Sequence, residues 1–88
     1  MIKKELKITN ELGIHARPAG MLANTASRFD CDIKLLKDGM EINAKSIMGI
    51  MTLAAAGGSV IEVIARGKDE TEAVKALEEL FARKFDED

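Results

Sequence analysis

The side chains best suited to chemistry lie near residue 15, where the only histidine of the chain is followed closely by an arginine. His15 stands two residues before Arg17, and Pro18 comes next. Proline fits the first turn of a helix, because its missing N–H is no loss there, and it disfavours helical geometry at the preceding residue. We therefore expect a helix to begin close to Ala16, with the imidazole at its N-terminus.

A histidine at that position would lie in an anion site that contains its own nucleophile. Helix N-termini present unpaired backbone N–H groups and a partial positive charge, and the forked guanidinium of Arg17 is suited to phosphate. These positive groups favour the neutral, nucleophilic imidazole, and they would stabilise a phosphoryl group once it is attached. The alternative is that His15 only caps the helix or packs there, since a lone histidine is a weak signal.

A second polar residue of interest, Ser46, precedes a short apolar segment. Serine is a good N-cap, so we expect a helix to begin after it and to end at the glycine pair 57–58. Ser46 is either a cap alone or a cap that can also be phosphorylated. A short helix cannot bury all its apolar side chains, so Ile47, Met48 and Met51 are expected to be partly exposed, as suits a surface with several partners.

The elements that must position these residues follow from periodicity. Alternating apolar and polar residues predict strands over 2–8, 32–37, from residue 40 and over 59–66. The Asp38-Gly39 link predicts a hairpin. Three-and-four spacing predicts helices over 16–28 and after Asp69, where Glu72 completes a capping box and Glu79 would pair with Arg83. One four-stranded antiparallel sheet with helices on one face satisfies this α+β pattern.

The sequence does not favour a cysteine nucleophile or a metal site. Cys31 lies between two aspartates, which raise a thiol pKa, and alternation points it inward, so we expect a structural cysteine and no nucleophilic pair with His15. One histidine and one cysteine do not make a dedicated zinc site, and we expect no metal or cofactor. The acidic residues 86–88 are expected to form a solvated end.

Length and composition set the outer limits. The chain has 88 residues and a net charge of −2, which predicts one domain, 1–88, and argues against nucleic-acid binding. A single cysteine excludes an intrachain disulfide, and no segment has the pattern of a signal peptide or a membrane span. We expect a cytoplasmic protein without membrane insertion, whose function lies on its surface because so short a chain can wall no large cavity.

Two segments carry a resemblance to a known family. Segment 13–19, Gly-Ile-His-Ala-Arg-Pro-Ala, resembles the active-site segment of HPr, the histidine-containing phosphocarrier family of the bacterial phosphoenolpyruvate–sugar phosphotransferase system. Segment 44–51, Ala-Lys-Ser-Ile-Met-Gly-Ile-Met, is similar to the regulatory-serine segment of that family. The similarity covers the whole chain in length, order of elements and spacing between the segments. Departures are mild: isoleucines at 14 and 47 replace common leucines, and Ala54 replaces a frequent glycine.

The resemblance implies an open-faced β-sandwich with sheet order 1-4-2-3 and three helices on one face. It implies that enzyme I phosphorylates His15 on Nδ1, that Arg17 and the helix start at Ala16 and Pro18 assist, and that IIA domains receive the phosphoryl group. It also implies docking of both partners on the surface of Ile47, Met48 and Met51, and an HPr kinase/phosphorylase that acts on Ser46.

Three functions follow as hypotheses. In the first, the chain is a monomeric phosphocarrier, a phosphotransfer intermediate rather than a stand-alone enzyme. In the second, it is a regulatory binding module, which binds a transcription regulator once Ser46 is phosphorylated. In the third, it is a phosphocarrier of the nitrogen-related branch of the same system, with the same chemistry and a different enzyme I.

Overall fold

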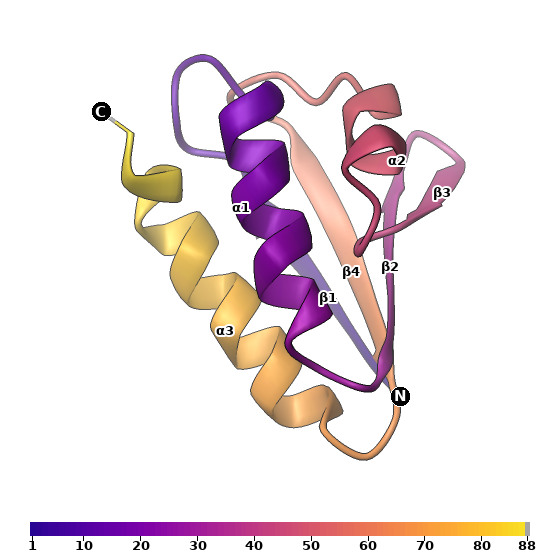
Figure 1. Cartoon of the computed structure of the whole chain (residues 1–88). Coiled ribbons are helices and arrows are strands. Elements are labelled where there is room, and N and C mark those ends of the chain that lie inside the picture. The colour runs from indigo at the N-terminus through magenta and orange to yellow at the C-terminus, as the bar shows by residue number, and fades with distance from the viewer. Residues whose placement is uncertain (88) are drawn as a thin grey trace.

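Four strands form one antiparallel sheet, and helices cover one of its faces (Figure 1). The computed structural model describes residues 1–87. In chain order the elements are β1 (Ile2–Lys7), α1 (Ala16–Ser27), β2 (Asp32–Lys37), β3 (Met40–Asn43), α2 (Ile47–Thr52), β4 (Val60–Arg66), α3 (Glu70–Ala82) and the short terminal turn η1 (Lys84–Asp86).

The strand order is β1-β4-β2-β3, which confirms the expected order 1-4-2-3 and the α+β fold class. All three pairings are antiparallel, with Leu6 opposite Ile61 on one side of β4 and Leu35 opposite Val63 on the other. The central position of β4 follows from its composition, because a β-branched, apolar strand is most stable with neighbours on both sides.

The core lies between the sheet and the helices. Inward-facing apolar residues of the central strands β2 and β4 are fully buried, and α1 contributes a stripe of small residues that lets the helix lie close to the sheet. The residues that make this layer include Ile33, Leu35, Ile61 and Val63 from the sheet, Ala19, Leu22 and Ala26 from α1, and Leu77 and Leu80 from α3.

Helix α2 ends earlier than the sequence predicts. It stops at Thr52, with Leu53 as C-cap, rather than at the glycine pair 57–58. The physical reason is Ala54, which takes a left-handed conformation (φ 48°) and so cannot continue the helix. The glycines serve a different purpose, since a Cβ on Gly57 would lie 2.5 Å from the carbonyl oxygen of Asn10. Gly57 thus allows two loops to pass close together, whereas Gly58 has a positive φ of 90° and no close neighbour at its Cβ position.

The start of α3 also differs from prediction. Asp69 is the N-cap residue, but its side chain caps nothing: its carboxylate oxygens accept the backbone N–H groups of Asp30 (2.8 Å) and Cys31 (2.9 Å). These hydrogen bonds hold the pKa of Asp69 below its usual value, and the one from the Asp30 N–H has the largest effect. The predicted capping box is therefore replaced by a bridge between the start of α3 and the residues just before β2. At the other end of α3, Arg83 pairs with Asp86 (3.1 Å) rather than with Glu79.

Cys31 is buried, which confirms its inward direction. Burial, and then the hydrogen bond to Asp69, raise the pKa of the thiol to about 11. A thiol that stays protonated is a poor nucleophile, so Cys31 has the properties of a core residue. In residues 1–87, no helix has the length and apolar character needed to cross a membrane.

Candidate functional site

His15 stands at the N-terminus of α1, as the sequence predicts. It is the N-cap residue with extended backbone (φ −86°, ψ −170°), and its carbonyl accepts the N–H of Ala19 at 3.0 Å. Its side chain makes no capping hydrogen bond and is 40% exposed, while Pro18 is buried in the first turn. The imidazole is therefore open to solvent beside the first-turn N–H groups of Ala16 and Arg17, which have no partner within a helix.

The loop before His15 is fixed by a close approach to the segment after α2. The Ile14 N–H donates to the carbonyl of Ala55 at 2.9 Å. Gly13 has a positive φ of 72°, and a Cβ there would lie 2.4 Å from the same carbonyl oxygen. Only glycine meets both conditions, so this residue sets where the loop delivers the histidine.

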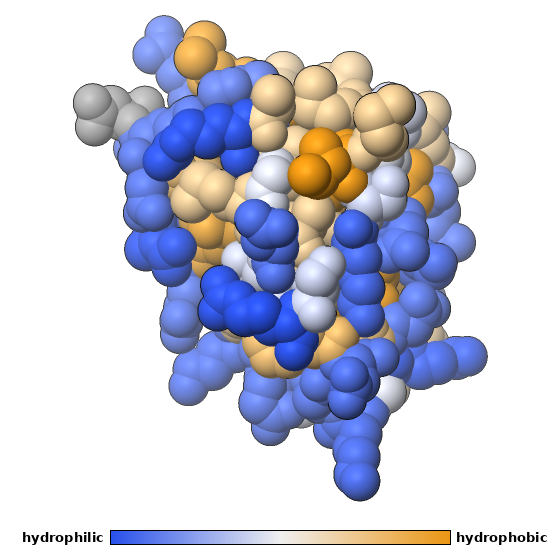
Figure 2. Space-filling view, in the orientation of Figure 1, coloured by the Kyte–Doolittle hydropathy of each residue, from blue (hydrophilic) through white to orange (hydrophobic). Residues whose placement is uncertain are grey.

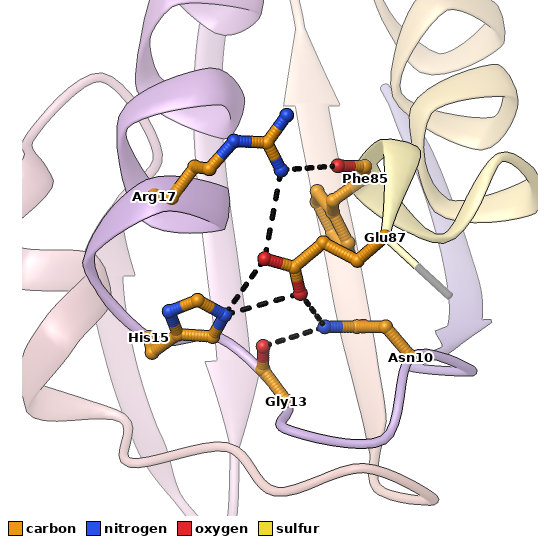
Figure 3. Close-up of polar contacts among 6 residues, drawn as sticks. All are labelled: Asn10, Gly13, His15, Arg17, Phe85 and Glu87. Atoms are coloured by element: carbon orange, nitrogen blue, oxygen red, sulfur yellow. Dashed lines mark hydrogen bonds and ion pairs between the residues drawn. The ribbon is translucent and has the colours of Figure 1, made fainter.

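The ring of His15 is in contact with a carboxylate. Its Nε2 lies 3.0 Å from Oε1 and 2.9 Å from Oε2 of Glu87 (Figure 3). The buried Asn10 donates through Nδ2 to the same Oε1 at 3.0 Å, and to the carbonyl of Gly13 at 2.7 Å. The hydrogen bond with His15 is the largest cause that lowers the pKa of Glu87. The second ring nitrogen, Nδ1, points away from Glu87 (Figure 3).

Arg17 lies on the other side of Glu87. Its Nη1 donates to the carbonyl of Phe85 at 3.1 Å and lies 3.5 Å from Oε2 of Glu87. Its other terminal nitrogen points away from these groups (Figure 3), and the side chain is largely exposed. The guanidinium is thus placed near the imidazole, through the carboxylate they share, and retains donors for an anion from solvent.

Residues 84–86 bring Glu87 to this place. Lys84, Phe85 and Asp86 all have positive φ, of 57°, 54° and 58°. Such a conformation costs a residue other than glycine roughly 1–2 kcal/mol. Burial of Phe85 offsets this strain, because its ring is fully enclosed and packs on Phe81 with centroids 4.9 Å apart. The chain therefore turns sharply after α3 and passes over the start of α1.

Two expectations are corrected here. The end of the chain is not simply solvated, since Glu87 is engaged with His15, Arg17 and Asn10; Asp88 lies outside the described residues. The surroundings of His15 are also not purely positive, because a carboxylate touches the ring. Sequence reasoning missed Asn10 and Glu87. Phe85 is the signal that could have indicated them, because a large apolar residue near an end suggests that the end is docked.

Ser46 is the N-cap of α2, as predicted, and its Oγ accepts the N–H of Gly49 at 3.0 Å. The structure does not bring it to His15. Lys45 contacts the carbonyl of Phe29, just beyond α1, whereas the far end of α2 leads to the loop beside Ile14. Ser46 thus lies at the start of α2, which is about 9 Å long, whereas the segment after the end of α2 contacts the loop that carries His15.

Apolar side chains are exposed on α2, as expected. Ile47, Met48 and Met51 are 46%, 79% and 41% exposed, and we call these three residues the apolar patch. Orange and pale orange atoms gather over α2 in Figure 2, whereas most of this face is blue. Leu12, in the loop before His15, is 75% exposed and was not anticipated. Exposed apolar side chains therefore lie both on α2 and in the loop before His15, and the segment after α2 contacts that loop.

The arrangement favours transfer of a small anionic group on a surface. In residues 1–87 there is no pocket to enclose a substrate and no cluster of ligands arranged for a metal ion. The site offers one imidazole whose Nδ1 points away from Glu87 (Figure 3), one guanidinium and the open N-terminus of α1. These groups can accept a phosphoryl group and stabilise its oxygens.

Comparisons with known proteins agree with this chemistry. The family model described as the PTS HPr component phosphorylation site matches residues 2–83. The phosphocarrier protein HPr of Treponema pallidum is 47% identical over 88 residues, and the alignment covers 100% of both chains. The crystal structure of HPr-C-His from Thermoanaerobacter tengcongensis has a TM-score of 0.96 and 46% identity, and covers 100% of this chain and 99% of that one.

Two further similarities bear on regulation and assembly. Crh, the catabolite repression HPr of Bacillus subtilis, has a solution structure with a TM-score of 0.66 and 40% identity, covering 91% of this chain and 95% of its own. A crystal structure of an HPr dimer from Thermoanaerobacter tengcongensis matches with a TM-score of 0.78 and 47% identity, covering 97% and 98%.

Proposed function

Because the chain belongs to the HPr family of phosphocarriers of the phosphotransferase system, we propose that His15 accepts a phosphoryl group from phosphorylated enzyme I and passes it to a sugar-specific IIA domain. The observation that carries this proposal is the exposed imidazole at the N-terminus of α1, with the Arg17 guanidinium close by.

The transfer step uses the lone pair of Nδ1. This nitrogen attacks the phosphorus of the donor, so that a new N–P bond forms at His15 while the bond from phosphorus to the donor breaks. The first-turn N–H groups of Ala16 and Arg17 and the guanidinium of Arg17 stabilise the phosphoryl oxygens. Pro18 supports this geometry by beginning the helix without an N–H of its own. Onward transfer to a IIA domain is the same exchange in the opposite direction.

The experiment mixes the protein with enzyme I, Mg²⁺ and phosphoenolpyruvate. We expect one acid-labile phosphate per chain, and none on His15→Ala. Because the imidazole is largely on the surface, this variant should keep the fold, which its amide NMR spectrum checks. An acid-stable adduct, or labelling that persists in His15→Ala, would contradict the proposal.

The partners must recognise this site from outside, and the apolar patch is suited to that role. Exposed methionine and isoleucine side chains can adapt to more than one partner surface. They lie on α2, which is in contact with α1. We propose that enzyme I and IIA domains dock here in turn, that the chain acts as a monomer in the cytoplasm, and that it needs no cofactor of its own.

Regulation through Ser46 is a second candidate function. The similarity to Crh, a catabolite repression protein, favours it, as does the place of Ser46 next to the apolar patch. Phosphorylation by an HPr kinase/phosphorylase would add about two negative charges beside Ile47. The charge would hinder docking of an acidic or apolar partner and create a surface for a transcription regulator. Ser46→Asp, tested for phosphotransfer and for regulator binding, separates this function from the first.

The nitrogen-related branch uses the same chemistry with a different enzyme I. A competition between the two kinds of enzyme I for this chain decides between the branches. Faster phosphorylation by the nitrogen-related enzyme I would assign the chain to that branch, and faster phosphorylation by the sugar-branch enzyme I supports our proposal.

A further inference from the structure

We propose that Glu87 is a positioning residue for His15: its carboxylate accepts the hydrogen on Nε2, so that Nδ1 keeps its lone pair and faces outward to the phosphoryl donor. The expected effect on phosphoryl transfer rests on the proposed function. The position of the proton on His15 does not, because it can be measured in the free protein.

The geometry fixes the tautomer. A neutral imidazole carries one hydrogen, on either Nδ1 or Nε2, and the nitrogen without it is the nucleophile. Both oxygens of Glu87 lie within 3.0 Å of Nε2. An ionised carboxylate only accepts hydrogen bonds, so contact with it requires the hydrogen to be on Nε2. The pKa of Glu87 lies below its usual value, chiefly through this hydrogen bond, which keeps the carboxylate ionised at neutral pH.

Asn10 holds the carboxylate in register with the histidine loop. Its side chain is buried, and its Nδ2 donates both to Glu87 and to the carbonyl of Gly13. Gly13 in turn lies two residues before His15, in the loop fixed against Ala55. The carboxylate is therefore tied to the same backbone that carries the imidazole, which is how outer partners orient a histidine ring.

The same contact suits the phosphorylated state. When Nδ1 bonds to phosphorus, the hydrogen stays on Nε2 and the ring gains positive charge as the donor bond breaks. The carboxylate of Glu87 stabilises that charge, as an acidic residue stabilises the imidazolium in a catalytic triad. No proton has to be gained or lost, so the exchange stays balanced and reversible.

The opposite role for Glu87 is competition with the phosphoryl group, and it predicts the opposite experimental result. Oε2 of Glu87 lies 3.5 Å from Nη1 of Arg17, so the carboxylate could instead compete with the phosphoryl group for the guanidinium. Competition predicts that removal of Glu87 accelerates phosphorylation, whereas positioning predicts that it slows phosphorylation. We favour positioning because the contacts to His15 are the shorter ones.

The first experiment reads the tautomer by ¹⁵N NMR of His15 at a pH where the ring is neutral. Wild type and Glu87→Gln, which retains an acceptor oxygen, should hold the hydrogen mainly on Nε2. Glu87→Ala should shift the population toward the Nδ1–H form. Asp86→Asn is the matched control, since it also removes one carboxylate but one that pairs with Arg83. The same tautomer in all four proteins, or Nδ1–H in wild type, would overturn the inference.

The second experiment measures the rate of phosphorylation by enzyme I. We expect Glu87→Ala to be slower by about tenfold, the scale typical of outer partners of a functional histidine, with Glu87→Gln between it and wild type. Asp86→Asn should match wild type. An unchanged or faster rate for Glu87→Ala would overturn the positioning role. Absence of phosphate on every protein, wild type included, would instead reject the proposed function, and the NMR result would still decide where the proton lies.

Discussion

His15 and Glu87 are in hydrogen-bond contact although 72 positions of the chain separate them. The contact exists because α3 ends beside the start of α1 (Figure 1), and because η1 then turns the chain back over the histidine loop. A residue near the C-terminal end thereby joins a site that the sequence places at residues 15–18.

Phe85 anchors this end, and its loss should affect both stability and the site. Phe85→Ala removes a fully buried ring that packs on Phe81. We expect a loss of about 3–5 kcal/mol in the free energy of unfolding, together with release of Glu87 from His15. Urea denaturation measures the first effect and the ¹⁵N shifts of His15 the second. Phe85→Leu, which keeps most of the apolar volume, should lose less on both measures; equal losses would contradict anchoring by burial.

Ser46 should separate stability from regulation. Ser46→Ala removes the acceptor of the Gly49 N–H and is expected to lower the free energy of unfolding by about 1 kcal/mol without changing phosphorylation of His15. Ser46→Asp keeps an acceptor oxygen and adds charge, so it should retain stability but slow phosphorylation by enzyme I. Thermal unfolding and the phosphotransfer assay measure the two effects. Unaltered phosphotransfer in Ser46→Asp would remove the regulatory role.

A change at Met48 tests the proposed docking surface. Its side chain is mostly exposed, so Met48→Ser should leave the unfolding midpoint nearly unchanged. It should raise the KM of enzyme I for this protein several-fold and change kcat little, because lost docking contacts are equally present in the ground state. Val60→Ser is the control, as another exposed apolar residue that points to the face of the sheet away from the helices. A similar rise in KM for both variants would argue against a specific patch.

Asp69 predicts a defined pH dependence of stability. Its folded-state pKa lies below the usual 3.8, because backbone N–H groups of Asp30 and Cys31 favour the ionised form. The stabilisation is therefore complete above pH 3.8 and is lost as pH falls from there through the folded-state pKa. Asp69→Asn should be less stable than wild type at pH 7, and the difference should shrink below pH 3.8. Denaturant midpoints between pH 7 and pH 2 measure this; a constant difference would refute the linkage.

The local features of the site could be predicted from the sequence. The start of α1 follows from Pro18, the cap of α2 from Ser46, and the exposure of Met48 from the shortness of its helix. Each of these depends on residues a few positions apart, where steric and hydrogen-bonding rules are strong. The inward position of Cys31 follows equally from alternation along a strand.

The long-range features could not be predicted in the same way. Asp69 has the type and spacing of a cap, yet its carboxylate accepts two N–H groups from the residues just before β2, which only the packed fold brings near. Glu87 has the composition of a solvated end, and its role depends on the strained turn before it. Ala54 ends α2 in a conformation that alanine rarely adopts, so no pattern rule would choose it.

The Ile14 N–H donates to the carbonyl of Ala55, so the connection between α2 and β4 helps to fix the position of the imidazole. An insertion or deletion between residues 54 and 58 is therefore expected to displace the imidazole of His15, although that connection is not itself part of the site. A design that replaces α2 with a new recognition helix must therefore keep the length of the connection that follows it.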